Sequence, residues 1–184
     1  VAVIGIGISN TPLLRMLLEA GVQVTACDKR SRADFSGLAE ELEGLGARLR
    51  LGEDYLEGLD QDVIFRTPGM RPDVPQLAEA VRRGSVLTSE MEVFFQVCPC
   101  RIIGVTGSDG KTTTTTIIAG LLKAAGRTVH VGGNIGTPLL SQAGEMSPED
   151  IAVLELSSFQ LMTMGQSPHI AVVTNLAPNH LDVH

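Results

Sequence analysis

The sequence predicts an α/β protein made of two successive units, each built around a parallel sheet. Three observations support this fold class. Short apolar runs typical of buried strands alternate with amphipathic helical stripes along the 184 residues. Glycines follow several of the predicted helices, as is usual at helix C-termini. A glycine-rich segment follows the first strand of each unit. Strands that alternate with helices need crossover connections, so we expect the sheets to be parallel.

The first unit is expected to span residues 1–97. Its strand-like runs lie at 1–4, 22–27, 47–51 and 62–65. Its helices are expected to start near Thr11–Pro12, to cross Leu38–Leu45, to run from about Val74 to Arg83, and to run from a capping box at Ser89-x-x-Glu92 to about Val97. Pro99 then interrupts the pattern, so we place the domain boundary near residues 96–100.

The second unit is expected to span residues 98–184. Its strands are predicted at 101–105, 128–131, 151–156 and 170–174. One helix is predicted near 111–125, with Ile117, Ile118, Leu121 and Leu122 on its apolar face, and another begins at Thr137–Pro138. No helix follows the last strand to cover the sheet. Because parallel sheets are covered on both faces, we expect the natural protein to continue beyond this chain.

The composition is that of a globular protein, with 43% hydrophobic and 19% charged residues. No apolar run approaches the ~20 residues of a membrane span, so no membrane partner is expected. The net charge of −7 and the lack of a basic stripe argue against nucleic-acid binding. Three cysteines, an odd count, favour a reduced cytoplasmic protein. Cys98-Pro99-Cys100 could be half of a metal site, but it lacks a second pair at zinc spacing.

The strongest chemical signal is a phosphate-binding loop between a buried strand and an amphipathic helix. Glycines allow successive amides to point at phosphate oxygens, and the helix N-terminus adds partial positive charge. Lys111 is suited to the β- and γ-phosphates, and the Thr112 hydroxyl to Mg²⁺. Val105 replaces the first glycine of the general pattern, so the match is to a shorter variant. A glycine-rich turn that merely caps the helix is the alternative. The ATP-phosphate site comprises Gly107, Ser108, Asp109, Gly110, Lys111, Thr112 and Thr113.

Polar side chains also follow the other strands of the second unit, where ligands collect in open α/β sheets. Asn134 follows the second strand, Glu155, Ser157 and Gln160 lie at the third, and His180 lies beyond the fourth. Glu155 sits in an apolar strand, where an unpaired carboxylate is costly. We favour magnesium ligation over a buried salt bridge. For His180, a structural role and a site role remain equally open.

The first unit carries Gly5-x-Gly7-x-x-Asn10, which is similar to a dinucleotide fingerprint whose third glycine is replaced. Asp28 lies at a suitable distance along the chain for a ribose contact. The alternative is a tight turn in which Asp28 serves as a cap. The predicted nucleotide-side residues are Ile8, Ser9, Asn10, Asp28, Lys29 and Arg30.

Four of these motifs in order resemble the Mur ligase family: Thr106-Gly-Ser-Asp-Gly-Lys-Thr-Thr113, Gly133-Asn-Ile-Gly136, Glu155-Leu-Ser-Ser-Phe-Gln-Leu161 and Asn175-Leu-x-x-Asn-His-Leu-Asp-x-His184. The third motif resembles the D-glutamate-adding members of that family. The resemblance covers essentially the whole chain. It departs at Asn179, where the family often has aspartate.

The resemblance implies a Rossmann-like domain for the UDP part of the substrate, followed by a P-loop-type parallel α/β ATPase domain that is incomplete here, and a C-terminal domain. It implies ATP and Mg²⁺ as cofactors, and UDP-N-acetylmuramoyl-L-alanine and D-glutamate as substrates in peptidoglycan precursor synthesis. The D-glutamate site would lie mostly in the C-terminal domain. The carbamylated lysine of the family would lie past the end of this chain, so we expect the chain alone to be inactive.

The roles implied for individual residues follow the motifs. Lys111, Glu155 and His180 would be catalytic, and Thr112, Glu155 and His180 would hold the metal. Asn134, Ser157, Gln160 and His180 would face the muramoyl-alanine end of the substrate. Other readings are another Mur-type amide ligase, a nucleotide-binding Rossmann oxidoreductase based on the first unit, and a regulatory nucleotide-binding module without ligase chemistry.

Overall fold

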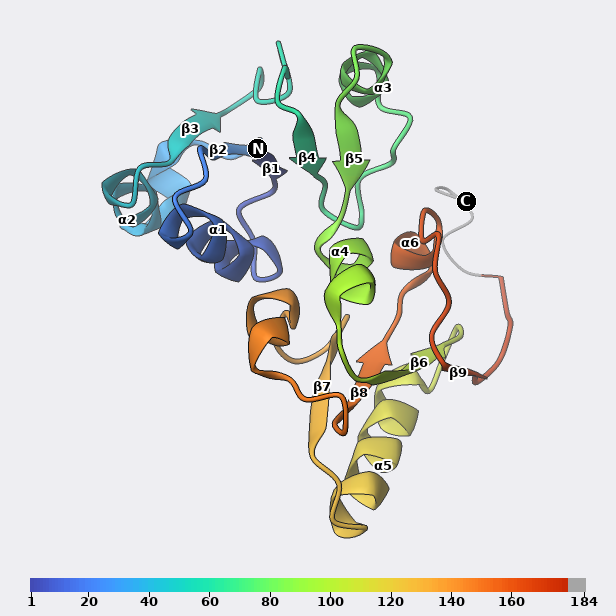
Figure 1. Ribbon diagram of the computed structural model, residues 1–184. Coiled ribbons are helices and arrows are strands. Elements are labelled where there is room, and N and C mark those ends of the chain that lie inside the picture. Colours follow the sequence, from blue (N-terminus) through green and yellow to red (C-terminus); the bar gives the residue numbers. More distant parts are fainter. Residues whose placement is uncertain (179–184) are drawn as a thin grey trace. The chain divides into compact units, whose positions relative to one another are not determined.

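The computed structural model describes residues 1–178 and confirms the predicted α/β class (Figure 1). It divides into two compact units, Val1–Glu90 and Met91–His184, each with its own parallel sheet. The division falls at the start of α4 (Glu90–Val97), whereas we placed the domain boundary after this helix. None of the helices among the described residues is long and apolar enough to cross a lipid bilayer.

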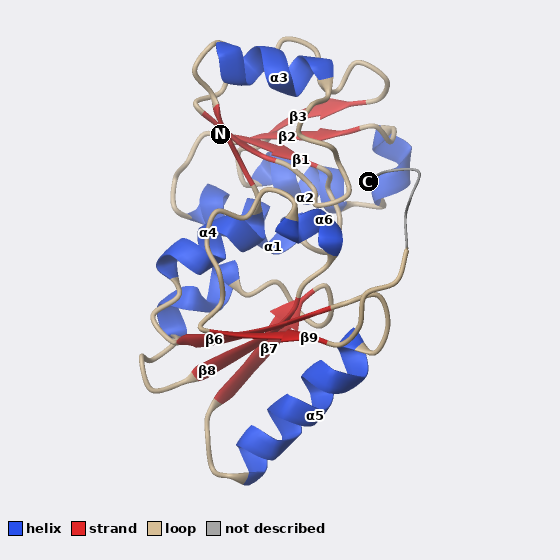
Figure 2. Ribbon diagram, turned by 90° about the vertical axis from the view of Figure 1, so that its right-hand side faces the viewer, coloured by secondary structure: helices blue, strands red, loops and turns tan. Residues whose placement is uncertain are grey.

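The first unit has a five-stranded parallel sheet in the order β3-β2-β1-β4-β5. Figure 2 shows α3 on one face of this sheet and α1 with α2 on the other. The chain leaves β1 toward β2 on one side and later returns to β4 on the other, so the carboxyl end of β1 lies at a topological switch point. The strands are β1 (Ala2–Ile4), β2 (Thr25–Asp28), β3 (Arg48–Leu51), β4 (Val63–Phe65) and β5 (Val86–Thr88).

The helices of this unit bury one apolar stripe each. They are α1 (Asn10–Glu19), η1 (Arg32–Phe35), α2 (Leu38–Gly44) and α3 (Pro75–Arg82). Leu77 and Ala80 of α3 join Ile4 and Ile64 of the sheet in one buried cluster. Burying each of the leucine and isoleucine side chains contributes roughly 1.5–3 kcal/mol, which holds α3 against the sheet.

Two local predictions for the first unit were inaccurate. Helix α1 begins at Asn10 and not at the predicted Thr11–Pro12 cap, because the Thr11 hydroxyl donates to the Gly7 carbonyl at 2.9 Å and the Asn10 side chain is buried. Strand β5 was not predicted. It holds three residues of mixed burial, which is too short to show a period of two.

The second unit has a four-stranded parallel sheet in the order β7-β8-β6-β9. Helix α5 (Lys111–Ala124) lies along one face and packs on β6, β7 and β8 (Figures 1 and 2). The strands are β6 (Arg101–Thr106), β7 (Val129–Gly133), β8 (Ile151–Glu155) and β9 (Ile170–Val173). Because β6 is parallel to both of its neighbours, β8 and β9, the segments that follow these three strands begin at the same edge of the sheet.

The buried face of α5 is rotated from the predicted one. Thr115 and Ala119 are buried, and Ile118 and Leu122 pack against the core, whereas Ile117 and Leu121 are 55% and 67% exposed. The small side chain of Ala119 allows the helix to approach the sheet closely. Spacing alone did not distinguish the stripe centred on small residues from the more apolar stripe beside it.

The prediction of a helix that begins at Thr137–Pro138 is wrong. The chain instead forms a 3₁₀ segment, η2 (Leu140–Glu145). A Cβ on Gly132 would lie 2.6 Å from Cγ of Leu139, so this segment is packed tightly onto the end of β7 before any helix begins. Gly144 lowers helix propensity near its other end. Helix α6 (Ser158–Leu161) was not predicted, although Ser157-x-x-Gln160 is a capping-box pattern.

Candidate functional site

The predicted phosphate loop connects β6 to α5 in the conformation its glycines allow. Gly107 and Gly110 have φ values of 135° and 77°, in the region that favours glycine. The ammonium of Lys111 folds back over the loop and donates to the carbonyls of Gly107 at 2.8 Å and Ser108 at 3.0 Å. The predicted phosphate-binding residues therefore form one continuous turn at the start of α5.

Four amides of this turn are available to a ligand. Among residues 1–178, no acceptor is recorded for the N–H groups of Gly110, Lys111, Thr112 and Thr113. The first amides of a helix have no partner within the helix, and the dipole of the 14-residue α5 adds partial positive charge there. Amides and ammonium together form an anion site of the kind that binds phosphate.

Glu155 lies at the end of β8 with its carboxylate buried, and the residue is 2% exposed. Oε2 accepts a hydrogen bond from the Thr112 hydroxyl at 2.7 Å, and Oε1 accepts one from the Asn134 amide at 3.0 Å. No lysine or arginine within the described part of the chain forms an ion pair with it. The predicted metal ligands Thr112 and Glu155 thus meet directly, although 43 positions separate them.

The carboxylate, the hydroxyl and the amide carbonyl are oxygen donors of the type that Mg²⁺ prefers. A buried carboxylate with two neutral hydrogen-bond donors still carries a full negative charge, which is costly unless a cation accompanies it. The side chains at this point therefore fit a divalent cation. Within the described residues, no group of three or more His, Cys, Asp or Glu side chains gathers around a metal position, so phosphate oxygens and water would supply further ligands.

Gly133 makes the contact between Asn134 and Glu155 possible. Its φ is 95°, and a Cβ at this position would lie 2.1 Å from the Glu155 carbonyl oxygen. The Asn134 amide N–H donates to that same carbonyl at 2.8 Å. Any larger residue would push β7 away from β8, so the glycine is required by the close approach of the backbones.

Ser157 and Gln160 form a reciprocal cap at the start of α6. The Ser157 hydroxyl accepts from the Gln160 amide at 3.3 Å, and Gln160 Oε1 accepts from the Ser157 amide at 2.9 Å. The side-chain oxygen of Gln160 is therefore engaged within the protein. Contact of both residues with a muramoyl-alanine group stays a prediction. His180 and Asn179 lie outside the described residues.

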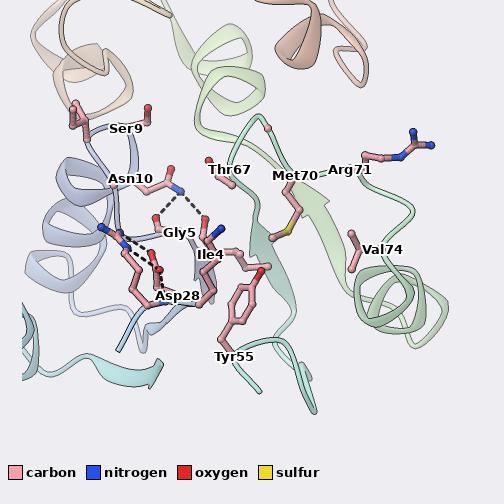
Figure 3. Close-up of a pocket in the computed structure, with 15 residues that line it drawn as sticks. Ile4, Gly5, Ser9, Asn10, Asp28, Tyr55, Thr67, Met70, Arg71 and Val74 are labelled. Carbon is pink, nitrogen blue, oxygen red and sulfur yellow. Dashed lines mark hydrogen bonds and ion pairs between the residues drawn. The ribbon is translucent and has the colours of Figure 1, made fainter. Parts of the chain in front are cut away.

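The first unit contains a pocket of about 640 Å³ at the carboxyl ends of β1, β2 and β4 (Figure 3). It brings together all six residues predicted for the nucleotide side: Ile8, Ser9, Asn10, Asp28, Lys29 and Arg30. The Asn10 amide reaches back to the carbonyls of Ile4 at 2.9 Å and Gly5 at 3.1 Å. The Asn10 side chain, which stands in place of the third glycine of the fingerprint, therefore binds the backbone of the loop itself. A role in substrate binding stays a prediction.

Asp28 is the centre of this loop, and the residue is 5% exposed. Oδ1 accepts from the amide and Nε of Arg30, and Oδ2 accepts from the Ile6 amide and Nη2 of Arg30, at 2.7–3.0 Å. These four bonds fill the acceptor capacity of a carboxylate. A direct bond to a ribose hydroxyl, as the fingerprint predicts, would require one of them to open.

The pKa of Asp28 reflects two opposing effects. Burial by itself raises it, but the hydrogen bonds from the Arg30 side chain and from the amides of Arg30 and Ile6 outweigh burial, so the pKa lies below its usual value. Because the folded-state pKa is lowered, the stabilisation is present above the unfolded-state pKa of about 4 and is lost as pH falls below it. Thermal unfolding of Asp28→Asn should therefore depend less on pH between 7 and 3 than that of the wild type. Equal acid sensitivity would show that Asp28 does not brace the loop.

Sequence reasoning missed the opposite wall of the pocket, which contains Tyr55, Thr67, Met70, Arg71 and Val74. The segment Thr67-Pro68-Gly69 was interpreted only as a turn. Its place after β4 could have identified it, since ligands collect where parallel strands end. Arg66, which is 2% exposed, holds this segment by donating Nη1 to the carbonyls of Pro68 at 3.1 Å and Met70 at 2.9 Å.

The chain matches known proteins along its whole length. Residues 105–184 match the Mur ligase middle domain. The chain is 55% identical over 185 aligned residues to a UDP-N-acetylmuramoylalanine--D-glutamate ligase of Clostridium botulinum, and 56% identical to that of Ruminiclostridium cellulolyticum. All of this chain aligns in both cases, but it spans 40% of each relative.

Two solved structures share the fold at lower sequence identity. The first is the UDP-N-acetylmuramate:L-alanyl-gamma-D-glutamyl-meso-diaminopimelate ligase from Neisseria meningitides, with a TM-score of 0.57 and 22% identity over 99% of this chain and 62% of that one. The second is the UDP-N-acetylmuramate-alanine ligase from Thermotoga maritima, with a TM-score of 0.56 and 22% identity over 98% of this chain and 42% of that one.

Proposed function

The chain belongs to the Mur ligase family, and on this premise we propose that it is the front part of an ATP-dependent ligase that adds D-glutamate to UDP-N-acetylmuramoyl-L-alanine. The observation that carries the proposal is the meeting of a phosphate loop with a buried carboxylate: Thr112, at the start of α5, donates to Glu155 at 2.7 Å. The identity to D-glutamate ligases of two organisms supports this member of the family over other Mur-type ligases.

ATP is proposed to bind by its phosphates at the loop. The free amides of Gly110 to Thr113 would hold the phosphate oxygens, and Lys111 would turn from its own carbonyls to the β- and γ-phosphates. Thr112 and Glu155 would hold Mg²⁺, which neutralises charge on the phosphates when bound. His180 is proposed as a further ligand on the strength of the family motif alone.

The proposed reaction has two steps. The substrate carboxylate first attacks the γ-phosphorus of ATP, which forms an acyl phosphate and releases ADP. The amine of D-glutamate then attacks the acyl carbon and loses a proton, and inorganic phosphate leaves as the amide bond forms. The contribution of this chain is electrostatic, because Lys111 and the loop amides stabilise the negative charge of the transferring phosphoryl group.

The UDP part of the substrate is proposed to occupy the pocket of the first unit. This pocket lies at a topological switch point, and hydrogen bonds to Asp28 hold the loop that borders it. Asn134, Ser157 and Gln160 would face the muramoyl-alanine end. A cytoplasmic location stays a prediction that rests on the odd number of cysteines.

Binding and turnover are expected to separate in the 184-residue chain. Calorimetry should detect binding of a non-hydrolysable ATP analogue with Mg²⁺, and of UDP-N-acetylmuramoyl-L-alanine. UDP-N-acetylmuramate, which lacks the alanine, is the matched control ligand and should bind more weakly. No phosphate should be released with ATP, substrate and D-glutamate present. Absence of binding by both ligands in a folded chain would contradict the proposed site, and phosphate release would contradict the expected inactivity.

A further inference from the structure

A short segment after β9 is bonded along its length to the phosphate loop. We call residues Thr174–Ala177 the strap. The Thr174 hydroxyl donates to the carbonyls of Asp109 at 2.6 Å and Thr106 at 3.2 Å. At its other end, the Ser108 hydroxyl donates to the Ala177 carbonyl at 2.8 Å and accepts from the Ala177 amide at 2.9 Å. The strap is therefore hydrogen-bonded to the first part of the loop, from Thr106 to Asp109.

Asn175 occupies the centre of the strap and makes a convergent contact. Its Oδ1 accepts from two successive backbone amides, Ser108 at 3.1 Å and Asp109 at 3.0 Å. Successive amides that point at one oxygen form the arrangement that binds anions in phosphate loops. In this protein the oxygen comes from a neutral side chain, so these two amides are used for holding the loop and the four amides that follow them remain for a ligand.

Lys111 holds the same two peptide groups from the other side. It donates to the carbonyls of Gly107 and Ser108, and the N–H groups of those two peptide units are the ones that donate to Asn175. Each of the two peptide groups thus accepts a hydrogen bond from the Lys111 ammonium at its carbonyl and donates one to Asn175 Oδ1 from its N–H. When Lys111 turns to a phosphate, the carbonyl side loses its partner and Asn175 keeps the amide side.

Close approach of the strap depends on Gly107. A Cβ at this position would lie 2.1 Å from the Thr174 hydroxyl and 3.0 Å from the Asn175 carbonyl oxygen. A side chain there would force the strap away from the loop. Gly107 is therefore needed twice: its positive φ allows the turn, and its lack of a side chain allows the strap to approach the loop.

We propose that Asn175 is a positioning residue for nucleotide binding, which maintains the curvature of the phosphate loop after Lys111 transfers its hydrogen bonds to the phosphates. This inference rests on the proposed function, since it assumes that the loop binds ATP. It predicts that loss of the Asn175 side chain weakens ATP binding while the ligand-free protein, in which Lys111 still holds the loop, keeps its thermal stability.

The test uses Asn175→Ala in the complete protein, with binding of an ATP analogue measured by calorimetry and unfolding measured by thermal melting. The Ser108 N–H also donates to the backbone carbonyl of Asn175 at 3.2 Å, which the variant keeps, so only the Asp109 N–H loses its acceptor. One hydrogen bond of about 0.5–1.5 kcal/mol corresponds to a fall in affinity of about two- to tenfold. The melting temperature should stay close to that of the wild type. Leu176→Ala is the matched control, because Leu176 lies in the same strap, is 89% exposed and should bind as the wild type does.

A second measurement follows the loop directly. Hydrogen exchange at the Asp109 amide in the nucleotide-bound protein should be faster in Asn175→Ala than in the wild type, whereas the Ser108 amide keeps its bond to the backbone carbonyl of Asn175. Asn175→Asp keeps an oxygen acceptor and should restore the protection, while its added negative charge still weakens ATP binding. If Asn175→Ala does not fold, hydrogen exchange in Asn175→Asp still tests the role of the side-chain oxygen.

The outcomes separate the two proposals. If the wild-type protein does not bind the ATP analogue, the proposed function fails and the inference fails with it. If the wild type binds but Asn175→Ala binds equally well or keeps its amide protection, the inference alone is overturned. An equal loss in Leu176→Ala would likewise overturn it, because the effect would then belong to the strap and not to the Asn175 oxygen.

Discussion

Replacing Lys111 with methionine in the proposed ligase is expected to lower kcat for phosphoryl transfer by about 10²–10³-fold, the scale seen when one preorganised charge-stabilising group is removed. The ammonium lies within 3.0 Å of two loop carbonyls and is the cation that the described loop offers to the phosphates. Methionine keeps the length of the side chain but carries no charge. The charge of the transferring phosphoryl group would then be stabilised by amides and metal alone.

The measurement is ATP-dependent phosphate release with both substrates at saturation. Lys123→Met is the matched control, since Lys123 lies in the last turn of the same helix and is exposed. It should retain wild-type turnover. A Lys111→Met enzyme with near wild-type kcat would show that the loop does not hold the reacting phosphates, and the proposed function would lose its basis.

Replacing Glu155 with glutamine is expected to have opposite effects on turnover and on stability. Mg²⁺-dependent turnover should fall by about 10²-fold or more, because the proposed ligand loses its charge. The metal-free protein should melt at the same temperature or higher, since a buried carboxylate without a cation is replaced by a neutral group of the same shape. Asn134 can turn its side-chain amide to restore a hydrogen bond with the new one.

Melting curves with and without Mg²⁺ and a magnesium titration of activity test this prediction. The exposed Glu145→Gln is the control and should change neither. If the melting temperature of Glu155→Gln were several degrees lower and its activity still depended on magnesium as in the wild type, Glu155 would be a structural residue. Because turnover should fall while the melting temperature stays the same or rises, this substitution is more informative than one that removes the side chain.

Three predictions for the second unit, the loop after β6, the buried face of α5 and a helix at Thr137–Pro138, differed in how well local sequence patterns could support them. The turn between β6 and α5 was predicted at its position, because strand, glycines, lysine and helix are neighbours in the sequence and their geometry is local; its binding of phosphate stays a proposal. The apolar face of α5 was predicted one step away from its true position, since the sheet selects Thr115 and Ala119 for close packing. The helix at Thr137–Pro138 failed because packing of Leu139 on Gly132 overrode a favourable start signal.

The first unit shows the same division. Its fingerprint predicted the six residues that line one wall of the pocket. It did not predict that Asn10 bonds to carbonyls of the loop itself, and it left open whether Asp28 contacts a ribose or caps the turn. A pattern of residue types does not say whether a polar group faces a ligand or its own backbone. Tyr55 and Met70 belong to no recognisable sequence motif, and only the folded structure shows that they line the pocket.

By itself, the sequence determined the α/β class, the alternation of elements and the position of the phosphate loop, because helical and strand periodicity are properties of neighbouring residues. The tertiary structure alone decided the direct hydrogen bonds from Thr112 and Asn134 to Glu155, and the contacts of Asn175 with a loop 66 and 67 positions earlier. Strand order places β6 between β8 and β9. That order depends on how whole strands pack, which no local pattern records.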